Sequence, residues 1–324
     1  MTVIAPLEAE GYVVSAHFLG DTAAFAVGDG TVRFLGGPEA LTPVYKDGLL
    51  SAARTQDGKA LVTGGGDGKI FRVEADGSAT FITERPRKWI DLLACGPQDA
   101  IAFASGRTAW VRLKNGEEKE FVHQRAVGGL AFAPKGMRLA TARYNGVTLW
   151  WVNAAGDPQE LHWDGAHSGV IYSPDGKYVV STMQENALHG WRLTDSQDMR
   201  MTGYPNKVKS ISWSAKGKYL ATSGAEAAIL WPFTGKNGPM GQQPLQLGVR
   251  GDSSVTQVCC HPKEDMLAIG YQDGMIMAVR FGDNAEVLLR RPGNGQVTAM
   301  DWDKSGTRLA FGTEEGAAGI ISLT

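Results

Sequence analysis

A pattern of two short apolar runs joined by a tight turn recurs eight times along the 324-residue chain. In most copies a second turn, such as Asp-Gly or Asn-Gly, then leads into a further apolar run. The first apolar residues of the second runs are Ala23, Leu61, Ile101, Leu139, Val179, Leu220, Leu267 and Leu309, which lie 38 to 47 residues apart. Units of about 40 residues rich in Gly and β-branched residues exclude helical repeats and predict repeated small sheets.

Each unit holds enough sequence for four strands, which is typical of a β-propeller blade. In the fourth unit the predicted strands include Val127–Pro134, Arg138–Tyr144 and Val147–Val152. The strands are apolar at nearly every position, as expected when neighbouring sheets cover both faces. Gly in most of these turns supplies the positive φ that a tight hairpin needs. The fold class is therefore all-β, a single propeller domain over residues 1–324.

The number of blades follows from the two ends of the repeat. The 23 residues up to Ala23 and the 15 residues after Leu309 together make one more period. We therefore predict eight blades, the last completed by the N-terminal strand Thr2–Leu7, which leaves no open edge in the ring. Seven blades is the alternative, if the weak third unit (Trp89–Val111) is irregular filler.

Composition narrows the classes of partner. Lys and Arg total 32 against 34 Asp and Glu, a net charge of −2, so nucleic acid is an unlikely partner. No apolar stretch is long enough to span a membrane, and no secretory signal precedes the first unit.

The three cysteines, Cys95, Cys259 and Cys260, suggest no disulfide framework. We expect reduced thiols in a cytoplasmic protein.

The fifth unit carries the residues of a known repeat. It reads AHSGVIYSPDGK over Ala166–Lys177, with His167 after a small residue, Ser181 in the next strand and Trp191 in the one after. This pattern resembles the WD40 repeat family, and the similarity covers essentially the whole chain. The resemblance implies a hydrogen-bonded structural brace within the blade, formed by His167, Ser181, Trp191 and Glu185, which stands where the family has Asp. Trp151 and Trp231 hold the Trp position in other units.

Chemical motifs are scarce. The stretch Gly64–Lys69 reads GGGDGK, but it lacks the spacing and the following Ser or Thr of a phosphate-binding loop, and it is interpreted as a hairpin turn. The six histidines lie apart, without the spacing of a metal site. No nucleophile motif is present. We therefore expect no catalytic residue, no metal and no cofactor.

One charge interrupts the innermost strands. Two residues after each inner strand begins, the chain has Val13, Ser51, Asp91, Gly129, Gly169, Ser210, Gln257 and Ala299. A carboxylate at such a position is costly unless it is paired or hydrated. Asp91 either lines the mouth of the central channel and holds a ligand, or pairs with Arg107, Arg87 or Lys88 to brace an irregular blade.

Basic and aromatic residues gather in the loops of the second to fourth units. By register, Lys46, Arg85, Arg87, Lys88, Trp89, Arg107, Arg125, Arg143 and Tyr144 share one face of the ring. Arg and aromatic side chains carry much of the energy of protein interfaces. The predicted partner-binding residues are Arg87, Lys88, Trp89, Asp91, Arg107, Arg125, Arg143 and Tyr144. The alternative is a solvated rim, its charge cancelled by Asp47, Glu84 and Asp99.

Three functions fit these observations to different degrees. The first is a non-catalytic scaffold that binds a protein or peptide, acidic or phosphorylated, on its top face. The alternative is a propeller enzyme of lactonase or hydrolase type with a metal at the central channel, for which Asp91, Gln257 and Asp301 are the candidates. A nucleic-acid binder is disfavoured by the charge. The insertion Pro232–Pro244 is either a partner-binding loop or a tolerated surface insertion.

Overall fold

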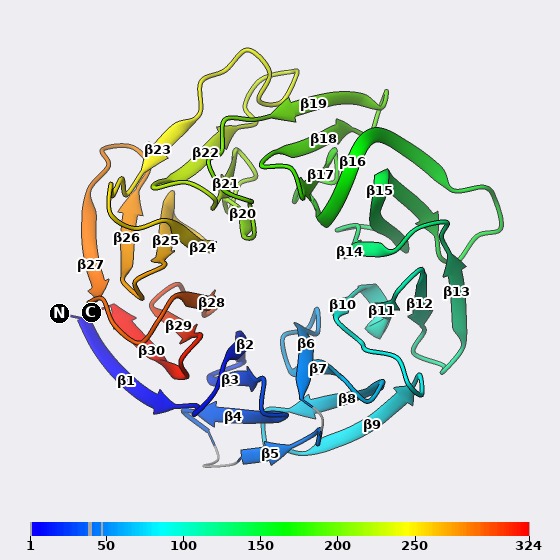
Figure 1. The fold of residues 1–324 in the computed structure, drawn as a ribbon, viewed down its shortest axis with the longest axis horizontal. Helices are drawn as coiled ribbons and strands as arrows, with labels where there is room; N and C mark the ends of the chain where they lie inside the picture. Colours follow the sequence, from blue (N-terminus) through cyan, green and yellow to red (C-terminus); the bar gives the residue numbers. More distant parts are fainter. Residues whose placement is uncertain (1, 38–40, 47, 324) are drawn as a thin grey trace.

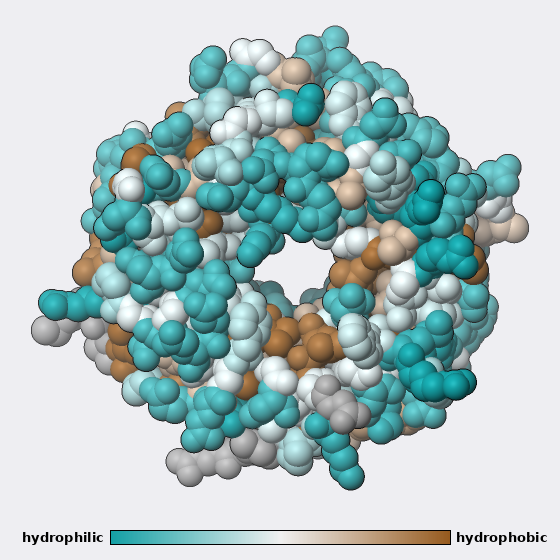
Figure 2. Space-filling view, viewed as in Figure 1, coloured by the Kyte–Doolittle hydropathy of each residue, from teal (hydrophilic) through white to brown (hydrophobic). Residues whose placement is uncertain are grey.

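The computed structural model describes residues 2–37, 41–46 and 48–323. Its strands form sheets arranged in a ring about a central opening, with β2, β6, β10, β14, β20, β24 and β28 nearest the opening (Figure 1). The face seen in Figure 2 is largely hydrophilic around this opening, and hydrophobic residues show on part of its wall. The all-β propeller predicted from the repeat is confirmed.

Three four-stranded sheets come first, and each runs outward from its innermost strand. The first contains β2 (Val13–Leu19), β3 (Thr22–Val27), β4 (Thr31–Leu35) and β5 (Leu41–Pro43). The second contains β6 (Leu49–Arg54), β7 (Ala60–Gly65), β8 (Lys69–Glu74) and β9 (Ala79–Glu84). The third contains β10 (Leu92–Cys95), β11 (Ile101–Ser105), β12 (Thr108–Arg112) and β13 (Glu118–Val122), with the 3-10 helix η1 (Pro97–Asp99) before β11.

The remaining sheets complete the ring. A six-stranded sheet contains β14 (Val127–Phe132), β15 (Arg138–Trp151), β16 (Gln159–Tyr172), β17 (Tyr178–Met183), β18 (Leu188–Arg192) and β19 (Gln197–Met201). It is followed by the sheet of β20 (Ile211–Trp213), β21 (Tyr219–Thr222), β22 (Ala228–Pro232) and β23 (Leu245–Leu247). Next comes the sheet of β24 (Val255–Cys260), β25 (Met266–Tyr271), β26 (Ile276–Arg280) and β27 (Glu286–Arg290). The last contains β28 (Val297–Trp302), β29 (Arg308–Thr313), β30 (Ala317–Leu323) and β1 (Thr2–Glu8).

The prediction of eight separate blades is wrong, because the described residues form seven sheets. All eight sequence units supply strands, but the fourth and fifth are joined in the six-stranded sheet. Hydrogen-bonded pairing continues from one unit to the next where Tyr144 pairs with Ala166, so β15 and β16 each run for 14 residues. The alternative of seven matches this count, although its reason does not hold: the third unit is a regular four-stranded sheet.

The ring closes as the sequence predicts. Strand β1 pairs antiparallel with β30 over its full length, from Thr2 with Leu323 to Glu8 with Ala317. The N-terminal strand therefore becomes the outermost strand of the last sheet. This pairing covers the edge that β30 would otherwise expose.

Burial explains the continuous apolar runs. Every residue of β7 and β17 is buried, and so are all but the first residue of β3. Clusters of these side chains fill the space between neighbouring sheets, with Phe25 and Tyr271 among the largest fully buried residues. Outer strands such as β9 have no buried residue and face solvent. Both faces of the second strands are thus covered, as the lack of alternation predicts.

Candidate functional site

The loops that carry the predicted binding residues are hydrogen-bonded to one another. The loop that leads into β10 is hydrogen-bonded to the end of β7, where Ile90 N donates to Gly65 O at 3.1 Å. In the same way, the start of β14 is hydrogen-bonded to the turn after β11, where Val127 N donates to Gly106 O at 2.8 Å. These loops therefore share one side of the ring, which we call the loop face.

The first depression on the loop face is the Trp89 pocket, of about 440 Å³. Its lining residues are Arg87, Lys88, Trp89, Asp91, Ser105, Gly106, Arg107 and Thr108. The Trp89 side chain is 71% exposed, which is unusual for the largest apolar side chain. Arg87 has a φ of 61°, in the left-handed region that a non-Gly residue seldom adopts. Five of the eight predicted binding residues therefore meet in one pocket.

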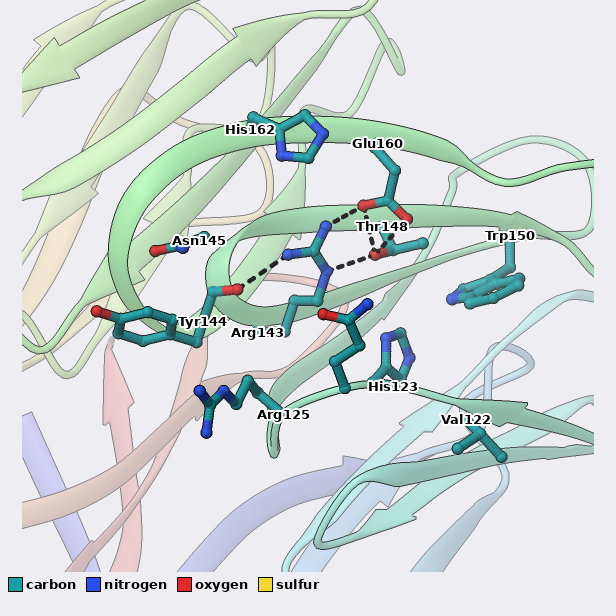
Figure 3. A pocket seen from close by; sticks show the side chains of 11 residues that line it. Val122, His123, Arg125, Arg143, Tyr144, Asn145, Thr148, Trp150, Glu160 and His162 are labelled. Carbon is teal, nitrogen blue, oxygen red and sulfur yellow. Dashed lines mark hydrogen bonds and ion pairs between the residues drawn. The ribbon is translucent and has the colours of Figure 1, made fainter.

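The second depression is the His123 pocket, of about 610 Å³ (Figure 3). Strands β13, β15 and β16 and the loop before β14 supply its lining, which comprises Val122, His123, Gln124, Arg125, Arg143, Tyr144, Asn145, Thr148, Trp150, Glu160 and His162. The other three predicted residues, Arg125, Arg143 and Tyr144, lie here. The prediction thus named part of this pocket, and it missed His123, Trp150 and Glu160.

The two pockets adjoin through the backbone. His123 N, in the second pocket, donates to the carbonyl oxygen of Arg107, in the first, at 2.8 Å. The bond from Val127 N to Gly106 O lies alongside it. The third and fourth units therefore present a continuous surface that holds all eight predicted residues.

Two of the predicted cations are engaged inside the protein. Arg143 donates to the carboxylate of Glu160, to Thr148 Oγ1 at 2.8 Å and to Tyr144 O at 2.9 Å. Its side chain is only 15% exposed. Arg85 is paired with Glu118 and lies over the rings of Phe103 and Trp110. The expectation that these two arginines face a partner is not supported, because acids on neighbouring outer strands already neutralise them.

The other predicted cations of the two pockets are not engaged in this way. Within the described part of the chain, Arg87, Lys88, Arg107 and Arg125 make no ion pair, side-chain hydrogen bond or ring contact, and all four are exposed. Of the acids expected to cancel them, Asp99 pairs with Lys114, which lies outside both pockets, and Glu84 forms no ion pair among the described residues. Asp47 is outside the described residues. No ion pair between described residues therefore cancels the charge of these four cations.

Asp91 lies immediately before β10 and is exposed at the wall of the Trp89 pocket. Because Asp91 is exposed, its charge is accessible to solvent and does not require a partner. No described cation lies within 4.0 Å of its carboxylate, so the brace with Arg107, Arg87 or Lys88 is not formed. Asp91 instead places a negative charge among three positive ones at the pocket.

His123 is an unusual member of its pocket because it is polar and almost fully buried, at 6% exposure. Its ring meets Trp150 edge to face, with 5.5 Å between centroids. Burial, aided by the nearby charge of Arg143, lowers the pKa of His123 to about 4, so the ring is neutral at pH 7. Its Nε2 atom has no hydrogen-bond partner among the described residues.

The brace implied by the WD40 resemblance is partly assembled. His167 Nδ1 lies 2.7 Å from Ser181 Oγ, which donates to His189 O at 3.1 Å. Glu185 accepts a hydrogen bond from Ala166 N at 3.4 Å rather than from the imidazole. Trp191 is buried and packs its ring near that of His167, with centroids 5.7 Å apart. Three of the four side chains thus meet, and the acid binds the loop.

Other units carry related braces that were not predicted from the sequence. In the sixth unit Tyr204 replaces the histidine: its hydroxyl lies 2.7 Å from Thr222 Oγ1 and accepts from Trp231 Nε1 at 2.5 Å. In the fourth unit Trp150, not Trp151, donates to Thr141 Oγ1 at 3.3 Å. Trp151 is 49% exposed, so its assignment to the Trp position is wrong by one residue. A shift of one along a strand moves a side chain to the opposite face.

The residues considered for an enzyme lie in three different units of the ring. Asp301 accepts hydrogen bonds from Arg54 and from the backbone of Phe18, whereas Asp91 lies at the Trp89 pocket. Gln257 is on β24. Over the described residues, no group of three or more His, Cys, Asp and Glu side chains is arranged to hold a metal ion. The same residues form no helix long and apolar enough to cross a bilayer.

The insertion is folded against the neighbouring unit. Arg192, on β18, donates to Lys236 O at 2.6 Å and to Asn237 Oδ1 at 3.1 Å. Inside the insertion, Gln242 Nε2 donates to Gly238 O at 2.7 Å. These bonds attach the insertion to the unit before it.

Comparison with known proteins identifies the type of repeat. The family model of the anaphase-promoting complex subunit 4 WD40 domain matches residues 258–324. WD repeat-containing protein 55 of Rattus norvegicus is 22% identical over 206 residues, which cover 61% of this chain and 52% of that protein. Tricorn protease homolog 1 of Streptomyces coelicolor is 29% identical over 159 residues, which cover 47% of this chain and 14% of that protein. The chain thus corresponds to about half of one relative and a small part of the other.

A solved structure shares the fold over the whole ring. The computationally designed Ika8 protein superimposes with a TM-score of 0.79 and 17% sequence identity, covering 98% of both chains. At that identity the likeness concerns the arrangement of the sheets and says nothing about binding or chemistry.

Proposed function

We propose that this chain, which is a WD40-repeat β-propeller, is a non-catalytic scaffold that binds an acidic or phosphorylated segment of another protein on its loop face. The binding surface consists of the Trp89 pocket and the His123 pocket. We further propose a cytoplasmic location, which the three unpaired cysteines support.

One observation supports this surface above the rest of the molecule. Most of the 17 arginines are held by acids, carbonyl groups or aromatic rings. Among the described residues, four have no such partner: Arg87, Arg107, Arg125 and Arg291. Three of these four line the two adjoining pockets. Uncompensated guanidinium groups are suited to recognise carboxylates or phosphates, which they bind in a bidentate manner.

The exposed aromatic rings fit the same role. Trp89 is 71% and Tyr144 51% exposed, and each stands beside an arginine that has no partner among the described residues. Aromatic and Arg side chains are enriched at the energetic centres of protein interfaces. A net charge of −2 over the whole chain leaves this local positive surface as the natural attachment point for an acidic segment.

Binding of fluorescein-labelled poly-L-glutamate at physiological salt tests the proposal. The double variant Arg107→Ala/Arg125→Ala is expected to weaken binding by about tenfold, since each exposed charge contact contributes about 0.5–1 kcal/mol. Arg291→Ala is the matched control, because Arg291 is also exposed and has no partner in the described part of the chain, but it follows β27 and lines neither pocket. It should change affinity less than twofold.

Two results would overturn the proposal. Equal losses in the double variant and in the Arg291 control would mean that the polyanion binds without using this surface. Tighter, steeply salt-dependent binding of oligo-dT through the same arginines would assign the surface to nucleic acid instead.

A further inference from the structure

Four asparagines of the chain are followed directly by glycine: Asn115, Asn145, Asn237 and Asn294. In such a pair the main-chain nitrogen of the glycine can attack the side-chain amide carbon of the asparagine, because glycine has no side chain to restrict the approach. The attack needs a nitrogen that is free to move and to lose its proton, and it is faster when the side-chain carbonyl is polarised. The four pairs differ in both respects.

The main-chain nitrogen of the glycine is held at two of the pairs and constrained at a third. Gly116 N donates to Leu113 O at 2.9 Å, and Gly238 N donates to Gly235 O at 3.3 Å. Gly146 lies within β15, so the pairing of that strand with β16 fixes its peptide. Attack at these three pairs requires hydrogen bonds or sheet structure to be given up first.

Gly295 is different because it lies outside the strands, in the loop that runs from β27 to β28 (Figure 1). Its nitrogen has no hydrogen-bond partner among the described residues. Asn294 before it is exposed, so water reaches its side chain. The attacking atom of this pair is therefore free of the constraints found at the others.

The side-chain carbonyl of Asn294 is also polarised by a cation. Its Oδ1 atom accepts a hydrogen bond of 3.0 Å from Nη2 of Arg290. The guanidinium is itself held in place, since Nη1 donates to Gly293 O at 3.0 Å and the group lies over the ring of Phe311. When the amide carbon is attacked, its oxygen becomes negative, and a cation already directed at that oxygen stabilises the charge.

The other asparagines lack one or both of these features. Oδ1 of Asn237 accepts from Arg192 at 3.1 Å, but the glycine nitrogen of that pair is held. Oδ1 of Asn115 and of Asn145 accepts only from neutral main-chain amides, at 3.0 and 3.2 Å. Of the four pairs, all in the described part of the chain, Asn294 alone combines a free nitrogen with a polarised carbonyl.

We propose that Asn294 is a site of spontaneous deamidation in the folded protein. Gly295 N gives its proton to a solvent base and forms a bond to Cγ of Asn294, while the carbonyl electron pair moves onto Oδ1. The pair then returns and expels the amide nitrogen, which takes a proton from water and leaves as ammonia. Water opens the resulting cyclic imide to aspartate or isoaspartate. The net reaction consumes one water and releases one ammonia, and it is independent of the proposed function.

Either product changes the loop that precedes β28. A carboxylate replaces a neutral amide beside Arg290, where it can form an ion pair. The isoaspartate route also adds one carbon to the main chain. This lengthens the loop next to the bond of 2.8 Å from Gly293 N to Asp273 O, which joins it to the turn after β25.

Peptide mapping by mass spectrometry tests the proposal on the unmodified protein. After incubation at pH 8.5 and 37 °C, all four sites are measured in one sample, so each is a control for the others. Asn294 is expected to deamidate about tenfold faster than Asn115, a fraction of what one oxyanion donor contributes in an enclosed active site. Asn237 should be intermediate. In urea that unfolds the protein, the four rates should converge, because the hydrogen bonds that distinguish the sites are lost.

A second experiment tests the guanidinium by the sign of its effect. Arg290→Gln should slow deamidation of Asn294 by about tenfold and leave the other three rates unchanged. If Arg290 only holds the loop still, the same change loosens the loop and accelerates the reaction, which would contradict the proposal. Circular dichroism checks that the variant is folded. In the unmodified protein, a rate at Asn294 no higher than at Asn115, or a difference that persists in urea, would also overturn the assignment.

Discussion

Asp301 on β28 accepts a hydrogen bond of 2.6 Å from Nη1 of Arg54 on β6, although 247 residues separate them. Strand β2 lies between these two inner strands and joins the same network. Phe18 N donates to Asp301 Oδ2 at 3.1 Å, and Phe18 O accepts from Arg54 at 3.3 Å. The last, first and second sheets are thus connected where the ring closes.

Asp301→Ala is expected to lower the free energy of unfolding by about 2–3 kcal/mol, because it leaves Arg54 and the Phe18 amide without their acceptor. The Asp301 side chain is only 17% exposed. Asp283→Ala is the control: Asp283 pairs with Arg280, but both side chains are more than half exposed, so the loss should be much smaller than in Asp301→Ala. Urea unfolding measures both, and equal losses would refute a special role for the closure.

Two buried tyrosines should respond oppositely to loss of the hydroxyl. Tyr204 Oη bonds with both Thr222 and Trp231, so Tyr204→Phe should cost about 1–3 kcal/mol of stability. Tyr172 Oη is buried and has no hydrogen-bond partner among the described residues, so Tyr172→Phe should be neutral or stabilising. Thermal unfolding of the two variants tests the contrast. A similar drop in both would show that Tyr172 has a partner, such as an ordered water.

Stability should fall as the pH drops below about 6.5. Burial lowers the pKa of His123 to about 4 and that of His189 to about 3, against about 6.5 in an unfolded chain. Between these values the unfolded state binds protons that the folded state does not, so the free energy of unfolding decreases with decreasing pH.

Each ring contributes up to about 1.4 kcal/mol per pH unit in that window. Urea unfolding at pH 7 and pH 5 measures the slope. His123→Phe should reduce it, and an unchanged slope in that variant would contradict a buried neutral His123.

The cysteines should be inert in the folded protein. Burial raises the pKa of Cys95 and of Cys260 to about 12, and it raises the pKa of Cys259 further. Since the thiolate is the reactive form, iodoacetamide at pH 7.5 should label none of the three until denaturant is added. Mass spectrometry counts the labelled sites. Rapid labelling of the native protein would show that a thiol is exposed and ionised.

The repeat and its closure could be read from the sequence because they depend on local patterns. Turn glycines and continuous apolar runs mark the strands, and the shared period of head and tail indicates the pairing of β1 with β30. The joining of the fourth and fifth units could not be read. It depends on the pairing of Tyr144 with Ala166, and the Asn-Gly turn nearby looks like the turns of the other units.

The sequence indicates which residues gather at the candidate site, but it does not show which of their charges are neutralised by a neighbouring acid. Strand register predicts that Arg85 and Arg143 lie on the loop face, and Arg143 does line a pocket there. Their neutralisation depends on Glu118 and Glu160, which lie on the outer strands β13 and β16. Which outer-strand acid reaches which arginine is set by three-dimensional packing. His123 carries no sequence signal, because no residue at metal-ligand spacing accompanies it and it lies before β14, whereas the position of His167 in the fifth unit is held in the fourth by Val127.

The pairing of Ala5 with Ile320 has a consequence for synthesis on the ribosome. These partners are 315 residues apart, so at roughly 5–20 residues per second the first strand waits about 15–60 s for its neighbour to be made. Throughout that interval its backbone donors and acceptors are available to any other strand edge. We expect the nascent chain to be most prone to misassociation in this period, and the final sheet to be the last part of the ring to form.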